Sequence, residues 1–172
     1  TKQNNYLASI HFGQKDIFGI SFLDISTGEF LCTQGSVAYI DKLLQSFAPA
    51  EVIYCKQFSH RFKELFGDKF NTYTFDDWAY TYDFAYPLLT KHFNTTTLKG
   101  FGIENLMDGI TASGVILQYL ADTEHRDINH ISTLARLDED KFVWLDKFTI
   151  RNLELVFPQH DGGVPLIDIL DR

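Results

Sequence analysis

The chain is poor in the residues that define several classes of protein. Only two of its 172 residues are cysteine, Cys32 and Cys55, which is too few for a disulfide framework and too widely spaced for a compact metal site. No apolar run approaches the roughly 20 residues of a membrane helix, and no basic stretch precedes an apolar one as in a secretory signal. We therefore expect two buried, reduced thiols, no membrane association and a cytoplasmic location.

Positive charge is also scarce. The 15 Lys and Arg residues are outnumbered by 23 Asp and Glu, so the formal net charge is −8. Domains that bind nucleic acid usually carry a basic face, and the nearest candidate here, residues 56–69, mixes both signs of charge. We interpret that segment as a solvated surface. The charge balance argues against this chain binding DNA tightly by itself.

The hydrophobic pattern predicts a mixed α/β fold. Hydrophobic residues make up 45% of the chain, enough for a packed core. Alternating or continuous apolar runs predict strands at residues 6–12, 17–24, 29–33, 51–55 and 71–75. Short turns join the first three strands, which indicates an antiparallel meander. Helices before the fourth and fifth strands indicate parallel crossovers, and this order is typical of a ribonuclease H-like sheet flanked by helices.

Helical spacing places the helices between and after these strands. Ser36 is expected to cap the first, which ends before Pro49, and Ser59 is expected to cap a short second helix that Gly67 closes. Asp76 or Asp77 should cap a third helix running to Phe93, and Pro87 should either kink this helix or begin its second half. A last helix is expected over residues 103–121.

Several sequence elements resemble one known family. Residues 23–30 read LDISTGEF, residues 100–105 read GFGIEN, and residues 118–123 read QYLADT. In this order they are similar to the connector domain of MutS-type DNA mismatch-repair proteins. Residues 145–155, LDKFTIRNLEL, resemble the start of the core domain of that family. The resemblance implies a ribonuclease H-like connector at residues 1–127 and a fragment of the core domain at residues 128–172, cut from a longer protein.

The resemblance implies a role as a linker and not as an enzyme. In the family this region joins the mismatch-binding domain to the core, relays ATP-dependent rearrangement and offers a docking surface to a MutL-type partner. No cofactor is expected in this piece. ATP, magnesium, mismatched duplex DNA and a homodimer are implied only for the full-length protein. A MutS relative that serves recombination is the alternative within the family, because the upstream mismatch-reading element is missing.

The alternative from another class is a metal-dependent nuclease. Such enzymes with this fold need clustered carboxylates, the first on the central strand. The strand at residues 6–12 carries no acid, Asp16 falls in a turn, and Asp24 ends the next strand. Gly100-Phe101-Gly102 lacks the spacing of a nucleotide-binding loop. A fold without its site does not imply the activity, so we expect no catalytic centre.

One predicted helix carries more apolar surface than a core needs. In the segment from Asp77 to Phe93, the residues Trp78, Tyr82, Ala85, Leu89 and Phe93 account for the core face. A second stripe remains, and a helix with two apolar faces is either deeply buried or touches a partner. The first interpretation, burial within the domain, is the simpler one; the second makes this stripe the candidate partner-binding surface. Its residues are Tyr80, Phe84, Pro87, Leu88 and Lys91.

Overall fold

The sheet begins with the predicted antiparallel meander. In this computed structural model, which describes residues 5–124 and 127–137, β1 (Tyr6–Phe12) pairs with β2 (Phe18–Asp24), and β2 pairs with β3 (Glu29–Gly35). β2 is buried along its whole length, as its continuous apolar run predicts. Turns at residues 13–17 and 25–28 keep the three strands adjacent, with Gly28 in the left-handed region that its turn requires.

The remaining strands extend the sheet on both sides of this meander. β4 (Glu51–Cys55) runs parallel to β1, and β5 (Thr72–Phe75) runs parallel to β4. β6 (Ala135–Arg136) adds a short parallel strand beside β3, which gives the order β5-β4-β1-β2-β3-β6. A meander on one side of a central first strand and parallel crossovers on the other confirm the predicted ribonuclease H-like sheet.

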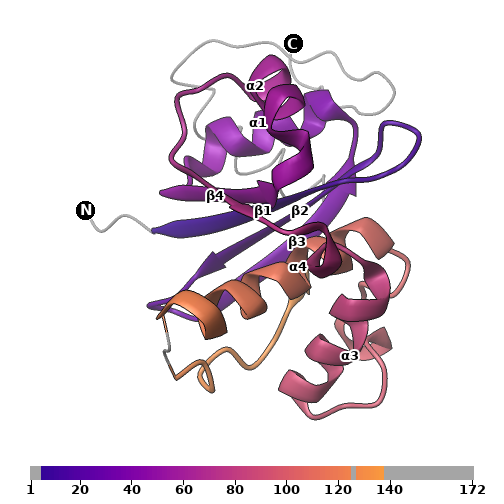
Figure 1. The fold of residues 1–172 in the computed structure, drawn as a ribbon. Coiled ribbons are helices and arrows are strands. Elements are labelled where there is room, and N and C mark those ends of the chain that lie inside the picture. The colour runs from indigo at the N-terminus through magenta and orange to yellow at the C-terminus, as the bar shows by residue number, and fades with distance from the viewer. Residues whose placement is uncertain (1–4, 125–126, 138–172) are drawn as a thin grey trace, which may run out of the picture. The chain divides into compact units, whose positions relative to one another are not determined.

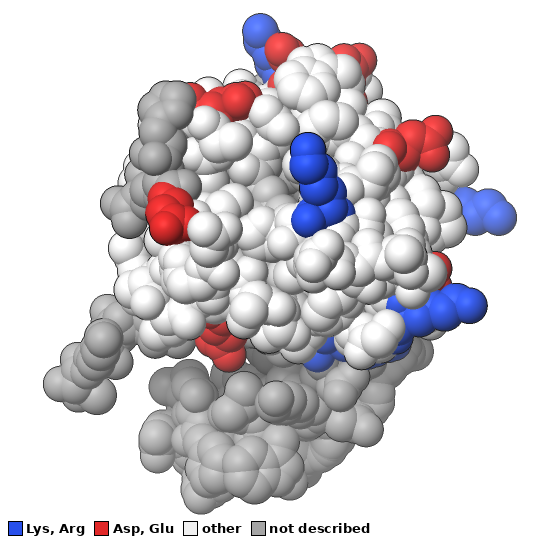
Figure 2. All heavy atoms as spheres, turned by 90° about the horizontal axis from the view of Figure 1, so that it is seen from below, with Lys and Arg blue, Asp and Glu red and all other residues white. Residues whose placement is uncertain are grey.

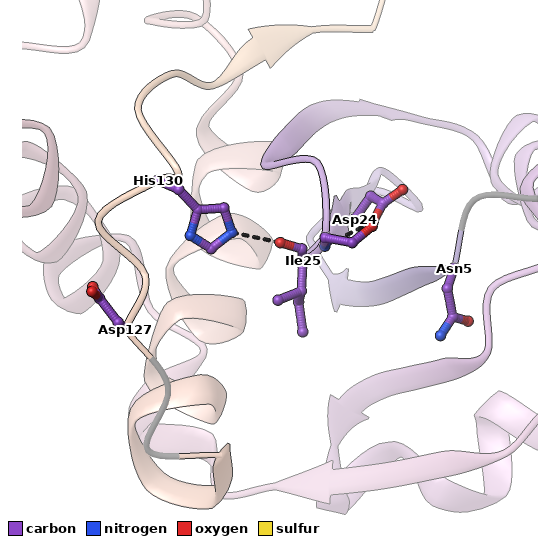
Figure 3. A pocket seen from close by; sticks show the side chains of 6 residues that line it. Asn5, Asp24, Ile25, Asp127 and His130 are labelled. Carbon is purple, nitrogen blue, oxygen red and sulfur yellow. Dashed lines mark hydrogen bonds between the residues drawn. The ribbon is translucent and has the colours of Figure 1, made fainter.

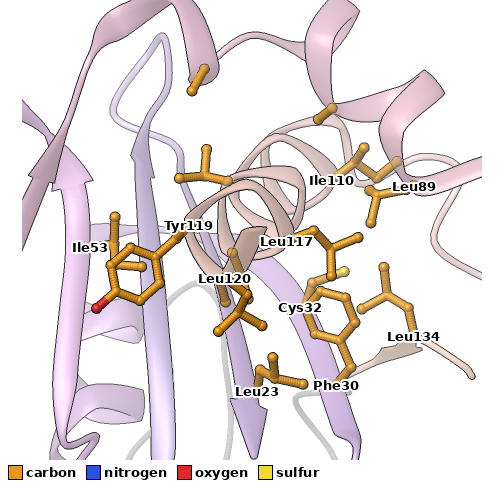
Figure 4. Packing of buried hydrophobic residues seen from close by; sticks show 14 of the residues in the cluster. Leu23, Phe30, Cys32, Ile53, Leu89, Ile110, Leu117, Tyr119, Leu120 and Leu134 are labelled. Atoms are coloured by element: carbon orange, nitrogen blue, oxygen red, sulfur yellow. The ribbon is translucent and has the colours of Figure 1, made fainter. Parts of the chain in front are cut away.

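Helices cover both faces of the sheet (Figure 1). α1 (Val37–Phe47) and α2 (Ser59–Phe66) lie on one face, and α4 (Met107–Tyr119) lies on the other, with α3 (Tyr82–Phe93) outside it. The backbone N–H of Tyr39 donates to Oγ of Ser36 (3.3 Å), so Ser36 caps α1 as predicted. Because α4 lies between the sheet and α3, it is buried nearly all round. Figure 4 shows Ile110, Leu117 and Tyr119 within this core.

The predicted helix from Asp77 to Phe93 is wrong in its first turn. Asp77–Ala79 form a separate 3-10 turn, and α3 begins only at Tyr82. The cap is Thr81, whose Oγ1 accepts from the backbone N–H of Phe84 (3.2 Å), and neither Asp76 nor Asp77 caps α3. The break lies at Tyr80, whose side chain turns into the core and pairs its hydroxyl with Oγ of Ser9 (3.0 Å).

Two smaller expectations are also corrected. Ser59 is the first residue of α2 and donates its hydroxyl to the carbonyl of Lys56 (2.8 Å), so it is not the cap. Gly67 closes α2 at a φ of 81°, as predicted. The last helix begins at Met107 and not at Ile103, because the preceding residues form turns whose apolar side chains are buried. A π-helical turn, Leu120–Glu124, follows α4 directly.

The compact unit ends at Arg136 and not at the expected boundary, Asp127. Residues after Asp127 return to the sheet, where Ala135 pairs with Leu31 in β3. Ile131 and Leu134 are buried in the same core as α4 (1% and 0% exposed). The predicted core-domain fragment overlaps this unit, and its motif at residues 145–155 lies outside the described residues.

Candidate partner-binding surface

The structure divides the predicted stripe into exposed, half-buried and buried residues. Pro87 and Lys91 are exposed on α3. Phe84 and Leu88 are half-buried and pack their inner sides against the core. These residues follow i, i+3, i+4 and i+7 spacing and therefore share one side of the helix. Tyr80 is buried and does not belong to the surface.

Tyr80 has an internal role instead. Its ring stacks on His11 with 5.9 Å between centroids and 9° between planes, and its hydroxyl pairs with Ser9. Burial raises its pKa above the ordinary value, so the hydroxyl stays neutral. Tyr80 thus anchors the turn before α3 to the central strand. Its prediction as a partner contact is corrected because helical spacing does not continue across that turn.

Trp78, and not Tyr80, is the exposed aromatic residue next to α3. Spacing assigns Trp78 to the core face, but its side chain is 49% exposed. Its ring meets Phe84 edge-on (5.1 Å, 89°) and Phe75 in a similar way (6.1 Å, 73°). Nothing in the sequence signals this exposure, since it follows from the break at Tyr80. We call Trp78, Phe84, Pro87, Leu88 and Lys91 together the α3 surface.

The face of the molecule that is seen from below carries scattered charges of both signs. Figure 2, seen from below the view of Figure 1, shows mostly uncharged atoms, with isolated Lys or Arg and Asp or Glu side chains among them. An exposed tryptophan beside half-buried apolar residues, with the exposed acids Asp76, Asp77 and Asp83 next to it in sequence, has the composition of a protein–protein contact and not of a phosphate-binding site.

Two titratable side chains, His11 and Asp108, lie close together beside Tyr80, where β1 meets the start of α4. Nε2 of His11 is 3.5 Å from Oδ1 of Asp108. Burial lowers the pKa of His11 to about 4 and raises the pKa of Asp108 above its ordinary value. His11 is therefore neutral at pH 7. With one carboxylate beside it, the cluster resembles a structural anchor more than a catalytic centre.

In the part of the chain that the structure describes, the acids that a nuclease needs are not gathered at one place. β1 has no carboxylate. Asp16 is exposed, and its Oδ1 lies 3.5 Å from Nη2 of Arg61. Asp24 is buried at the end of β2. Among residues 5–124 and 127–137, no group of three or more His, Cys, Asp or Glu side chains could hold a metal ion. Within the same part of the chain, no helix is both long and apolar enough to cross a membrane.

Comparison with known proteins gives a consistent result along the whole chain. The family model described as MutS domain II matches residues 5–132. The chain is 62% identical over 170 residues to the DNA mismatch repair protein MutS of Cytophaga hutchinsonii, covering 99% of this chain and 20% of that protein. It is 54% identical over 172 residues to the MutS of Flavobacterium psychrophilum, with 100% and 20% covered.

A third curated relative gives the same result. The MutS of Bacteroides fragilis is 52% identical over 171 residues. The chain thus spans about a fifth of the length of these curated relatives, 20% in each case. Among solved structures, the nuclease domain of the large terminase subunit of bacterial virus Sf6 matches at 12% identity and a TM-score of 0.38. That match covers 84% of this chain and 70% of the viral one.

Proposed function

We propose that this chain, which belongs to the MutS family of DNA mismatch-repair proteins, links the mismatch-binding domain of a longer protein to its core domain. Because the chain corresponds to 20% of its relatives' length, the activities of the whole protein are part of the proposal. We assign ATP and magnesium binding, mismatched-duplex recognition and homodimer formation to regions beyond this unit. The relatives named above are mismatch-repair proteins, which favours repair over recombination.

We further propose that the α3 surface docks a MutL-type partner. The observation that carries this is the exposure of Trp78, a large aromatic side chain supported edge-on by Phe84 but left half outside the core. Aromatic anchors of this kind contribute strongly to protein interfaces. Lys91, exposed at the far end of the stripe, supplies a charged rim beside the apolar centre.

Trp78→Ala should weaken association with a MutL-type protein by about 2 kcal/mol or more, because it removes the exposed anchor. The melting temperature should fall only slightly, since the tryptophan is 49% exposed and its removal leaves no enclosed cavity. Leu88→Ala and Phe84→Ala should also weaken binding, with larger losses of stability because both residues reach the core. Binding and melting are measured on the same samples by calorimetry.

Met107→Ala is the matched control for this experiment. Met107 is 53% exposed, so it is as accessible as Trp78, but it lies at the start of α4 outside the α3 surface. Its truncation should leave binding unchanged. Equal losses for both variants, or none for Trp78→Ala, would place the docking surface elsewhere.

We also propose that the chain has no catalytic centre of its own. The absence of a carboxylate on β1 supports this, as does the dispersal of Asp16 and Asp24. The purified chain should cut neither duplex DNA nor an RNA–DNA hybrid when magnesium or manganese is titrated from zero to millimolar levels. Cleavage that survives stringent purification and disappears in Asp24→Asn would instead establish a metal-dependent nuclease.

A further inference from the structure

The outer edge of β5 is open for pairing with a further strand. In the part of the chain that the structure describes, β5 ends the sheet and pairs with β4 alone. The backbone N–H of Val52 in β4 donates to the carbonyl of Asn71 (2.9 Å), which sets the alternation along β5. Thr72 and Thr74 therefore direct their N–H and C=O groups away from β4. Both residues are exposed, and no described residue forms a hydrogen bond with those outward groups.

The opposite edge of the sheet is covered by the chain itself. The segment after α4 returns there, and β6 pairs with β3. In the same segment, Nε2 of His130 donates to the carbonyl of Ile25, in the turn that precedes β3 (Figure 3). Natural sheets also protect open edges with lysine, proline or a bulge. Apart from its short length, β5 has none of these, because its sequence is TYTF and its pairing with β4 is regular.

Aromatic rings line the α4 side of the β5 edge. Tyr73 is 38% exposed, and its ring meets Tyr119 of α4 edge-on, with 4.9 Å between centroids. Phe75 points to the same side because side chains alternate along a strand, and its ring centroid lies 6.0 Å from that of Tyr73. Trp78 continues the row, 6.1 Å from Phe75. An apolar residue on an added strand would pack against Tyr73 as a cross-strand pair.

The charges beside β5 favour a basic occupant. Asp76 and Asp77 follow the strand directly and are exposed, and neither has an ion-pair partner among the described residues. Asp68 is exposed before the strand. The nearest cation in sequence, Lys69, donates to Oε1 of Gln45 in α1 (3.1 Å). A second copy of this chain, with its net charge of −8, would bring like charge to this edge, whereas a segment with Lys or Arg would neutralise it.

We propose that the outer edge of β5 receives an extended, basic segment of another protein, which pairs with Thr72 and Thr74 and adds a strand to the sheet. Alternate residues of this segment are apolar, so that one of them covers Tyr73, and it carries Lys or Arg where it passes Asp76 and Asp77. In this mode of recognition backbone hydrogen bonds supply the attachment, and alternate side chains supply the selectivity. The site requires neither the α3 surface nor the MutL-type partner proposed above.

The probe for this site is a peptide with blocked ends, in which valine and threonine alternate between a lysine at each end. Titrated into the chain, it should slow hydrogen exchange of the Thr72 and Thr74 amides saturably, as followed by NMR. Methylation of the peptide's backbone nitrogens removes its donors and should weaken binding at least about tenfold. Glutamate in place of both lysines reverses the charge and should weaken binding about threefold or more at low salt.

Two variants at one position test the chain's side of the contact. Thr74→Pro removes an outward N–H and should abolish the protection of Thr72, whereas Thr74→Val keeps the N–H and should bind the peptide as the unchanged chain does. Proline is tolerated where its nitrogen points away from the sheet, so the fold should survive. If Thr74→Pro fails to fold, the methylated peptide decides.

Four results would overturn the proposal. They are equal binding of the methylated or the glutamate peptide, an equal loss in Thr74→Val and Thr74→Pro, no saturation at millimolar peptide, and protection of Thr72 and Thr74 that grows with the concentration of the chain alone. The last result would assign the edge to a second copy of this chain. Weaker binding of both altered peptides, with loss in Thr74→Pro alone, supports the site whether or not the α3 surface docks a partner.

Discussion

A chain that stops at Asp127 should be less stable than one that stops at Leu137 by at least about 4 kcal/mol. The shorter chain lacks Ile131 and Leu134, which are 1% and 0% exposed, and it uncovers the core beneath them. It also loses β6 and the hydrogen bond between Nε2 of His92 and the carbonyl of Ile131 (2.7 Å). Such a loss is a large part of the 5–15 kcal/mol that stabilises a typical domain.

Urea denaturation of the two truncated chains measures this difference. The double variant Ile131→Ala, Leu134→Ala in the longer chain is the matched control and should reproduce most of the loss, because it empties the same part of the core. If the shorter chain instead unfolds cooperatively with a free energy of unfolding within about 1 kcal/mol of that of the longer chain, residues 128–137 contribute little to stability. In that case the boundary predicted from the sequence, Asp127, is the better one.

Gly19→Ala should destabilise the unit by about 3 kcal/mol or more. At Gly19 the backbone of β2 meets the start of α4 so closely that a Cβ there would overlap the backbone of Asp108. A backbone neighbour cannot rotate away, so α4 would have to move off the sheet. Gly109 on the helix makes a similar approach, since a Cβ there would lie 2.9 Å from the carbonyl oxygen of Thr33. Thermal unfolding followed by circular dichroism measures the loss.

Gly100→Ala is the control for this substitution. A Cβ at Gly100 would meet nothing within 4 Å, and the same chemical change should therefore shift stability by less than about 0.5 kcal/mol. A similar loss at both positions would show that the effect does not come from the contact between β2 and α4, because the lower conformational freedom of alanine in the unfolded chain favours folding and cannot itself cause a loss.

The local pattern was sufficient to predict five of the six strands, β1 to β5. Each of these five strands is marked by an apolar run between turn residues. Ser36 caps the start of α1 and Gly67 ends α2, as the sequence indicates. The family resemblance is confirmed as well, because the family model matches residues 5–132, which contain the motifs at residues 23–30, 100–105 and 118–123. Both kinds of signal are local in sequence, so no knowledge of tertiary contacts was needed to read them.

The candidate site was harder to predict because tertiary contacts decide it. The spacing from Asp77 to Phe93 suits one continuous helix, but the hydrogen bond from Tyr80 to Ser9 spans 71 positions and breaks that helix. The break exchanges the roles of two aromatic residues, burying Tyr80 and exposing Trp78. The burial of Ile131 and Leu134 depends in the same way on β6 reaching β3, which two residues of strand do not signal.

Because Cys32 is buried, the reactivity of its thiol reports how often the core of this unit becomes exposed. The thiol lies in the core on β3, completely shielded, and burial raises its pKa to about 12 (Figure 4). Since only the thiolate attacks disulfide and maleimide reagents, Cys32 is chemically silent in the native state at neutral pH. The rate at which Cys32 is labelled therefore measures how often the core becomes exposed to solvent. No engineered probe is needed to time how often this unit loosens.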